Sequence, residues 1–463
     1  MTGRTETLAG SFRDPSGFVF SREGDLYRQV NLAHRADYDL LLSSGLYDSL
    51  LGEGLLIPHE EVDVEPAAPG AYKVLRPEPV TFVSYPYEWS FSQLRDAARI
   101  TLRIQSMAMD HGLSLRDASA YNVQFHAGRP VLIDTLSLGA LPEGRPWVAY
   151  RQFCEQFLAP LALMSYRDVR LGQLLRVHLD GVPLDLAVPL LPRRIRMRAP
   201  LLIHLVLHAK SQRRHGDDTE PAASRGGLSP RALRGLIDSL RSGVEGLALP
   251  GEPSEWRAYD LQATHYSDEE ARRKEELVSG FIEHVRPATV WDLGANVGRF
   301  SRLASRRGIP TIAFDIDPAC VDESYRRARS EDDRHLLPLV LDLANPSPGI
   351  GWANAERMTL EQRGPADLCL ALALVHHLAI GRNVPLPRIA DLLTRMGRWI
   401  AVEFVSKEDE RVAQLLLNRE DVFPEYTEEG FEQAMTARFE ILRREPIRET
   451  KRTLYLLRRR EGP

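Results

Sequence analysis

One stretch limits the fold of this 463-residue chain more than any other: TVWDLGANVGRF, residues 289–300. A strand-like apolar run ends in an acidic residue, and Gly294 and Gly298 follow with Asn296 between them. Glycines let a backbone turn sharply and approach a ligand closely. The spacing differs from the G-x-G-x-x-G of dinucleotide sites, and no phosphate-loop lysine follows. The stretch therefore predicts a ligand-binding turn between a buried strand and a helix.

Beyond residue 256, strand-like and helix-like patterns alternate along the chain. Apolar runs such as TIAFDID and WIAVEFV are separated by amphipathic runs such as LPRIADLLTRMG. This alternation predicts an α/β domain with a doubly wound, mostly parallel sheet, which we place at residues 256–463. The runs FEILRREPI and RTLYLLRR predict an antiparallel hairpin at the edge of that sheet.

The glycine turn resembles the first motif of the class I S-adenosylmethionine (SAM) dependent methyltransferases, which have a Rossmann-like fold. That motif is an acidic residue followed by glycines at alternate positions, and Asp292, Gly294, Asn296 and Gly298 match it. Asn replaces the middle glycine, and Asn tolerates left-handed backbone better than most residues. The resemblance covers roughly residues 256–460 and implies that these four residues bind SAM.

The same resemblance implies cofactor contacts at the ends of the next two strands. The family holds the ribose hydroxyls with an acidic residue after the second strand, where Asp315 fits and Asp317 is the alternative. An acidic residue after the third strand meets the adenine amine, which implies Asp342, with Leu343 beside the ring. A surface or capping role without a ligand stays open for these carboxylates.

Three residues near later strand ends are candidates for catalysis. SAM carries its own leaving group, so the protein mainly positions the acceptor, and a base is needed only when the acceptor carries a proton. His376 and His377 follow the fourth strand, and an unperturbed imidazole titrates close to neutral pH. Glu403 lies towards the end of WIAVEFV, at the carboxyl edge of the sheet. The histidines could equally cap the next helix. Tyr259 and Tyr266 are candidates for a lid over the cofactor or for plain packing.

A second motif lies in LRDASAYNVQFHAGRPVLIDT, residues 115–135. Asp117 and Asn122 are five residues apart, as in a kinase catalytic loop, and Asp134 follows twelve residues later. The stretch resembles protein kinases and aminoglycoside phosphotransferases. The resemblance implies an α+β kinase-like domain at residues 1–200, in which Asp117 would be the base while Asn122 and Asp134 would hold magnesium.

Active phosphotransfer is disfavoured by what surrounds this motif. Kinases place a lysine on the third strand, but the only lysine before residue 210 is Lys73, which follows the candidate helix. Arg28 is the candidate replacement, although arginine and lysine are not interchangeable there. We therefore expect a kinase-derived domain that binds a nucleotide-like or other substrate without transferring phosphate. A purely structural role for the motif stays open.

Local patterns predict the remaining elements of the first half. Residues 211–230 are polar and aperiodic, which favours a linker, and residues 201–255 as a whole are expected to join the two domains. Expected elsewhere are a hairpin over 18–30, a helix over 37–54, two strands over 71–89, a helix over 91–112, further helices over 147–210 and a bridging helix over 231–243.

The stretch 187–215 holds seven Arg or Lys residues and no acid. It could touch an anionic partner or a membrane surface, although a solvated helix face is the simpler explanation.

Composition narrows the classes of protein. The net charge of −5 disfavours a nucleic-acid partner, and the three separate cysteines form neither a disulfide framework nor a CxxC metal site. No apolar run approaches the roughly 18–20 residues that span a bilayer, so we expect a cytoplasmic protein. The chain has 54 Arg and 5 Lys, which is typical of a GC-rich bacterial genome.

Together these features predict a SAM-dependent methyltransferase that acts on a small metabolite or natural-product intermediate, with a kinase-like domain assisting substrate recognition. A bifunctional methyltransferase/phosphotransferase and a non-catalytic binding protein are the alternatives, and an RNA methyltransferase fits the acidic charge less well. The turn after the fourth strand lacks an N-P-P-Y-type loop, which mildly favours oxygen or carbon as the acceptor atom.

Overall fold

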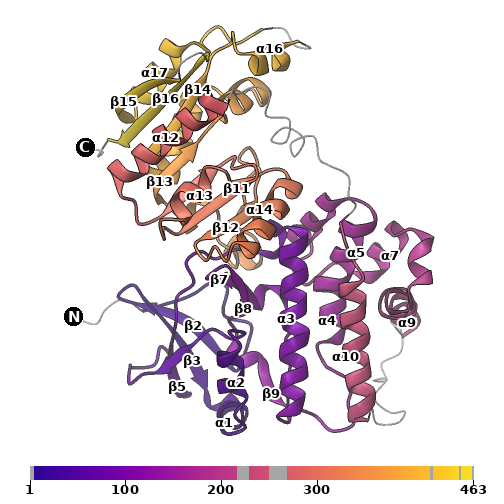
Figure 1. The fold of residues 1–463 in the computed structure, drawn as a ribbon. Helices are drawn as coiled ribbons and strands as arrows, with labels where there is room; N and C mark the ends of the chain where they lie inside the picture. Colours follow the sequence, from indigo (N-terminus) through magenta and orange to yellow (C-terminus); the bar gives the residue numbers. More distant parts are fainter. Residues whose placement is uncertain (1–4, 216–228, 250–267, 418–420, 448–449, 461–463) are drawn as a thin grey trace. The chain divides into compact units, whose positions relative to one another are not determined.

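The contacts of the chain divide it into two compact units. The first comprises Met1–Gly251 with Gly349–Arg357, and the second comprises Glu252–Pro348 with Met358–Pro463. The computed structural model describes residues 5–215, 229–249, 268–417, 421–447 and 450–460 (Figure 1).

The first unit begins with an antiparallel sheet. The predicted hairpin forms: β2 and β3 pair around Gly24, whose φ of +93° suits a glycine turn. Of the two strands predicted over 71–89, only β5 forms. Pro77 and Pro79 lack an N–H to donate to a neighbouring strand, and Pro86 begins a short 3₁₀ helix. The strand order is β1 (Thr5–Thr7), β2 (Gly17–Arg22), β3 (Asp25–Asn31), β5 (Ala71–Pro77), β4 (His59–Glu61).

Helices form the rest of the first unit. The helix predicted over 37–54 is broken at Gly45, whose φ is +76°, into α1 (Arg35–Ser43) and α2 (Leu46–Gly52). The helix predicted over 91–112 is confirmed as α3 (Phe91–Asp110). No helix among the described residues is both long and apolar enough to cross a bilayer.

The other elements of the first unit complete the predicted helical region and form two short two-stranded sheets, β6 with β9 and β7 with β8. In chain order they are β6 (Leu113–Leu115), β7 (Val123–His126), β8 (Arg129–Leu132), β9 (Leu138–Ala140), α4 (Tyr150–Phe153), η5 (Cys154–Leu158), α5 (Ala159–Tyr166), η6 (Val169–Gln173), α6 (Leu174–Val177), α7 (Leu184–Leu190), η7 (Arg193–Met197), α8 (Ala199–Leu201), η8 (Leu202–Leu207), α9 (His208–His215) and α10 (Pro230–Glu245).

The division of the chain falls near residue 251 rather than at residue 200. Helix α10, expected as a bridge inside the linker 201–255, packs against α3 within the first unit. The guanidinium of Arg99 donates to the Glu245 carboxylate at 2.7 Å. The apolar face of the helix is buried, which is why α10 cannot be a free linker. Residues 216–228 and 250–255 of the expected linker lie outside the described residues.

The second unit contains the predicted mostly parallel sheet. The chain passes from β10 outward through β11 to β12, then returns to the other side of β10 to form β13 and β14. The predicted antiparallel hairpin at the edge is also present. The strand order is β12 (Leu336–Val340), β11 (Thr311–Asp315), β10 (Val290–Leu293), β13 (Ala366–Ala371), β14 (Gly397–Val405), β16 (Arg452–Arg459), β15 (Phe439–Ile447).

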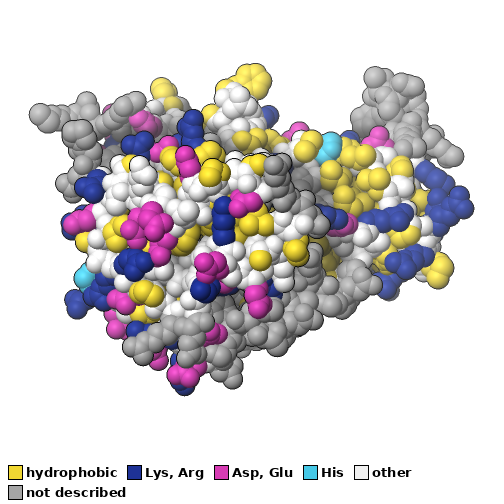
Figure 2. All heavy atoms as spheres, turned by 90° about the horizontal axis from the view of Figure 1, so that it is seen from above, with side chains coloured by type: hydrophobic (Ala, Val, Ile, Leu, Met, Phe, Trp, Pro, Cys, Tyr) yellow, Lys and Arg dark blue, Asp and Glu magenta, His cyan; other side chains and the backbone are white. Residues whose placement is uncertain are grey.

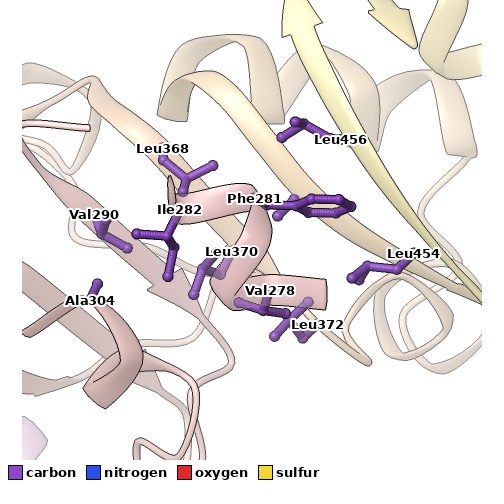
Figure 3. Packing of buried hydrophobic residues seen from close by; sticks show 11 residues of the cluster. Val278, Phe281, Ile282, Val290, Ala304, Leu368, Leu370, Leu372, Leu454 and Leu456 are labelled. Carbon is purple, nitrogen blue, oxygen red and sulfur yellow. The ribbon is translucent and has the colours of Figure 1, made fainter. Parts of the chain in front are cut away.

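Helix α12 (Asp268–Val285) supplies one side of the core of the second unit. Val278, Phe281 and Ile282 point from this helix onto apolar side chains of the sheet, including Leu370 and Leu454 (Figure 3). Burying side chains of this size stabilises a fold by about 1.5–3 kcal/mol each. The remaining helices are α13 (Ser301–Ser305), α14 (Pro318–Ser330), α15 (Leu386–Met396), α16 (Glu410–Leu416) and α17 (Glu428–Thr436).

Candidate functional site

The glycine turn after β10 uses left-handed backbone at every position that its motif names. Gly294, Asn296 and Gly298 have φ angles of +85°, +51° and +76°. Most side chains are strained in this region, whereas Gly and Asn tolerate it. A Cβ atom on Gly298 would lie 2.7 Å from the Ser324 hydroxyl, so that position also has no room for a side chain.

Hydrogen bonds tie this turn to the end of β11. The N–H of Gly294 donates to the Phe314 carbonyl at 2.8 Å. The Asp315 carboxylate accepts from the N–H of Asn296 at 2.7 Å and from the N–H of Asp317 at 2.8 Å. Burial raises the pKa of Asp315 to about 6. A carboxylate has about four acceptor sites, so Asp315 can accept further hydrogen bonds from a ligand.

Asp292 lies behind the turn and is almost completely buried. Its carboxylate accepts a hydrogen bond from the Ser301 hydroxyl at 2.6 Å, which joins the end of β10 to the start of α13. Burial raises the pKa of Asp292 to about 6, and the Asp315 charge adds to this rise, while Lys274 opposes it.

The other predicted cofactor residues occupy the ends of β11 and β12. The Asp317 carboxylate caps α14 by accepting from the N–H of Ala319 at 2.8 Å. The Asp342 carboxylate accepts a backbone N–H two residues further on and faces the Arg382 guanidinium at 3.4 Å. Leu343 beside it is half-buried.

His376 and His377 follow β13, and their ring centroids lie 4.1 Å apart. Burial lowers the pKa of His377 to about 4 and the pKa of His376 well below its ordinary value, so both imidazoles are neutral at pH 7. His376 is almost completely buried, and its Nδ1 has no hydrogen-bond partner among the described residues. This nitrogen can therefore bond to a ligand.

Glu403, on β14, is the centre of a buried cluster of charges. Its carboxylate accepts from the Lys274 ammonium at 2.6 Å and from the N–H of Ala373 at 2.8 Å. The Arg452 guanidinium lies 3.6 Å from the second carboxylate oxygen. Burial lowers the pKa of Lys274, although the nearby Glu403 charge opposes that change. These partners occupy the carboxylate of Glu403 and fix its orientation.

The turn after β13 carries backbone strain that Glu403 holds in place. Ala373 has a φ of +50°, a left-handed conformation that costs an alanine roughly 1–2 kcal/mol. The sequence indicated a turn here but not its left-handed backbone, and Lys274 and Arg452 were missed. The one available signal was that Lys274 is among only five lysines, on the helix just before β10.

The glycine turn and the turn after β13 lie at the carboxyl edge of the sheet, next to the point where the strand order reverses. Open α/β sheets bind ligands in the crevice outside such a point. Asp315 and Asn296 come from one side of it, and His376 comes from the other. Tyr259 and Tyr266, the predicted lid, lie outside the described residues.

In the first unit, the residues of the second motif are neighbours. The Asp117 carboxylate accepts from the N–H of Ser119 at 2.8 Å and from the Gln152 amide at 2.6 Å. Burial raises the pKa of Asp117, and the Asp134 charge adds to the rise, while the Asn122 amide opposes it.

The Asp134 carboxylate is already neutralised. Arg28, on β3, forms an ion pair with it, and both side chains are largely buried. A magnesium ion would have to compete with this guanidinium for the same oxygens. Across the described ranges, no three His, Cys, Asp or Glu side chains are grouped as they would be around a metal ion.

A comparison with curated proteins found a full-length relative. The chain is 37% identical to nodulation protein NoeA of Rhizobium meliloti (strain 1021) over 468 residues, which cover 99% of this chain and 97% of NoeA. No family model matches the chain.

Solved structures resemble parts of the chain only distantly. WbdD, in a co-crystal with a kinase inhibitor, is 14% identical with a TM-score of 0.32, over 45% of this chain and 43% of WbdD. Magnesium protoporphyrin IX methyltransferase (ChlM) from Synechocystis PCC 6803 is 15% identical with a TM-score of 0.30, over 46% and 90%. N-methyltransferase NodS from Bradyrhizobium japonicum is 12% identical with a TM-score of 0.32, over 42% and 99%.

The pKa values of Asp292 and Asp315 predict a loss of stability as the pH rises. An Asp titrates near ~3.9 in an unfolded chain, but these two titrate near about 6 in the folded protein. The folded state therefore holds their protons more tightly, and this stabilisation is complete below pH ~4 and is lost as the pH rises through ~6. Between pH ~5 and ~7.5, the free energy of unfolding should fall by about 1 kcal/mol for each carboxyl.

Urea denaturation of the full ligand-free chain measures this dependence. Asp315→Asn removes the contribution of one carboxyl, so the free energy of unfolding of this variant should rise by about 1 kcal/mol relative to that of the wild type between pH ~5 and ~7.5, whatever the buried histidines contribute to both curves. The matched control Asp367→Asn changes a carboxylate at the opposite end of β13 and should keep the wild-type dependence. Parallel pH curves for Asp315→Asn and the wild type would contradict the assignment.

Proposed function

The chain belongs to the family of nodulation protein NoeA, and on this premise we propose that it is a SAM-dependent methyltransferase that acts on a small molecule. The observation that carries the proposal is the carboxyl edge of the sheet where the strand order reverses, with the left-handed turn at Asn296 after β10 and His376 after β13. The relative is named a nodulation protein, and we propose that this chain serves the same process.

Each side of the crevice has its own part in binding the cofactor. Asp315 accepts hydrogen bonds from the ribose hydroxyls with the lone pairs that the two backbone N–H groups leave free on its two oxygens. The turn at Gly294 and Gly298 lets the backbone approach the cofactor closely. Asp342 meets the adenine amine, with Leu343 beside the ring. Asp292 and Asp317 act through the turn and the α14 cap that they hold.

SAM, when bound, supplies a methyl group on a sulfonium that is already a good leaving group, so the protein has to place the acceptor in line with it. His376 is the residue that we assign to the acceptor, because its Nδ1 is buried and unpartnered among the described residues. Its lowered pKa keeps the imidazole neutral, so an unprotonated ring nitrogen can accept a hydrogen bond from the hydroxyl group that receives the methyl group. The His377 ring packs against it at a tilt and holds it in place.

Glu403, a candidate base in the sequence, is better described as a positioning residue. Its carboxylate is held by Lys274 and by the N–H of Ala373, three residues before His376. Proton transfer from an acceptor to Glu403 would break the buried ion pair, which is costly. We propose that the pair fixes the turn that carries His376.

For the first unit, we propose a kinase-like domain that binds part of the substrate and does not transfer phosphate. The Arg28–Asp134 ion pair supports this, because it occupies a carboxylate that a phosphotransferase would use for magnesium. The bifunctional alternative keeps some support from the neighbouring positions of Asp117, Asn122 and Asp134.

SAM affinity tests the first part of the proposal. Replacing Asp315 with Asn removes the charged acceptor for the ribose, and hydrogen bonds to charged groups contribute about 1.5–3 kcal/mol. Calorimetry should therefore find about 10- to 100-fold weaker SAM binding for Asp315→Asn, and unchanged binding for the control Asp367→Asn. Wild-type affinity should also fall below pH ~6, because the ribose favours the ionised carboxylate. Equal affinity of the wild type and Asp315→Asn would argue against this site.

Nucleotide turnover tests the second part. With magnesium and ATP, the wild-type chain should release no more ADP than Asp117→Ala, because Arg28 neutralises Asp134. Turnover that Asp117→Ala abolishes, and that the exposed-carboxylate control Asp48→Ala preserves, would establish the bifunctional alternative instead.

The acceptor can be found by comparing metabolites of the host with and without the gene. Methyl transfer replaces a hydrogen by CH₃, so a compound should lose about 14 daltons when the gene is deleted. The same loss should appear in a strain that carries Asp315→Asn. If no compound changes its mass by 14 daltons in either strain, the result would favour a non-catalytic binding protein.

A further inference from the structure

The helices that follow α6 expose a group of arginines and a lysine that no acidic side chain within the described ranges neutralises. Arg193, Arg194, Arg196, Arg198 and Lys210 are all exposed, and none forms a salt bridge with any described residue. Arginines elsewhere in the chain commonly pair with acids, as Arg103 does with Glu53. We call these five residues, with the apolar side chains between them, the basic–apolar face.

Apolar side chains are exposed among these cations. Met197 is 86% exposed, and Ile203 and Leu207, one helical turn apart, are 46% and 49% exposed. Leu190, at the end of α7, is also exposed. Exposed side chains of this kind carry a cost in water, and a group of them beside cations indicates a surface that another phase or molecule covers.

The elements that carry these residues form one surface of the first unit. Helix α7 contacts both η8 and α9, and η7 contacts η8. Helices α7 and α9 lie on the right in Figure 1. The right side of Figure 2 shows hydrophobic side chains next to Lys and Arg side chains, with few acids.

We propose that the basic–apolar face binds the surface of an anionic lipid bilayer. Cations attract anionic headgroups, and arginine side chains reach them while their apolar stems stay near the acyl chains. Met197, Ile203 and Leu207 then enter the boundary between headgroups and acyl chains. A nucleic acid would satisfy the cations but would leave these apolar side chains in water. This proposal is independent of the methyl-transfer chemistry of the second unit.

Flotation of the full chain with vesicles tests the proposal. We expect binding to vesicles of phosphatidylcholine with 30% phosphatidylglycerol, and little binding to phosphatidylcholine alone. Each cation near an anionic surface contributes about fivefold in partitioning. The triple variant Arg193→Ser, Arg196→Ser, Lys210→Ser should therefore bind about a hundredfold more weakly. Met197→Ser keeps every charge and should bind about tenfold more weakly, because an inserted apolar side chain is lost.

A matched control removes the same charge elsewhere. Arg326→Ser, Arg327→Ser, Arg329→Ser changes three exposed arginines of α14 and should bind vesicles as the wild type does. If this control binds vesicles as weakly as the first triple variant, the loss of net charge alone explains the weaker binding, and the proposal is overturned. The proposal would also be overturned if Met197→Ser bound the vesicles as tightly as the wild type does. Tighter binding of the chain to transfer RNA than to the anionic vesicles would overturn it as well. Thermal denaturation of each variant confirms that the comparison is between folded proteins.

Discussion

The buried contact between Lys274 and Glu403 connects more of the second unit than any other polar interaction described above. The lysine comes from the helix before the first strand of the sheet, and the carboxylate comes from β14. The same carboxylate holds the strained Ala373 turn, and Arg452 of β16 lies beside it. Removing one partner of a buried pair leaves an uncompensated charge and typically costs 3–5 kcal/mol. The turn that precedes His376 therefore depends on this buried ion pair.

The two units differ in how their carboxylates are satisfied. In the second unit, backbone N–H groups bond to Asp315 without bringing a positive charge, and burial raises the pKa of this carboxyl. In the first unit, the guanidinium of Arg28 neutralises Asp134. An uncompensated carboxylate at a crevice favours a neutral hydrogen-bond donor such as a sugar hydroxyl. A carboxylate that a guanidinium neutralises attracts a metal ion only weakly. The two resemblances therefore lead to different functional proposals.

The sequence was sufficient where function depends on local backbone geometry. The mostly parallel sheet, its antiparallel edge hairpin and the glycine turn follow from patterns along the sequence, because strand, turn and helix are neighbours in the chain. The role of Glu403 was not predictable, because its partners lie 129 and 30 residues away in the sequence. The assignment of α10 to the first unit likewise depends on packing against α3, which a polar flanking sequence hides. Of the two strands expected over 71–89, only one forms. The prolines in this stretch argued against the second strand, but the alternation of apolar residues was given more weight.

Asparagine at position 296, where related motifs have glycine, has a further consequence for the turn. Its side-chain oxygen accepts from the next N–H at 2.6 Å, so the left-handed backbone is braced by the residue itself. An unfolded chain samples fewer conformations at asparagine than at glycine, and ordering this position therefore loses less entropy. A loop that is stiff before its ligand arrives has less freedom to surrender on binding, so rigidity here translates into affinity without any added contact.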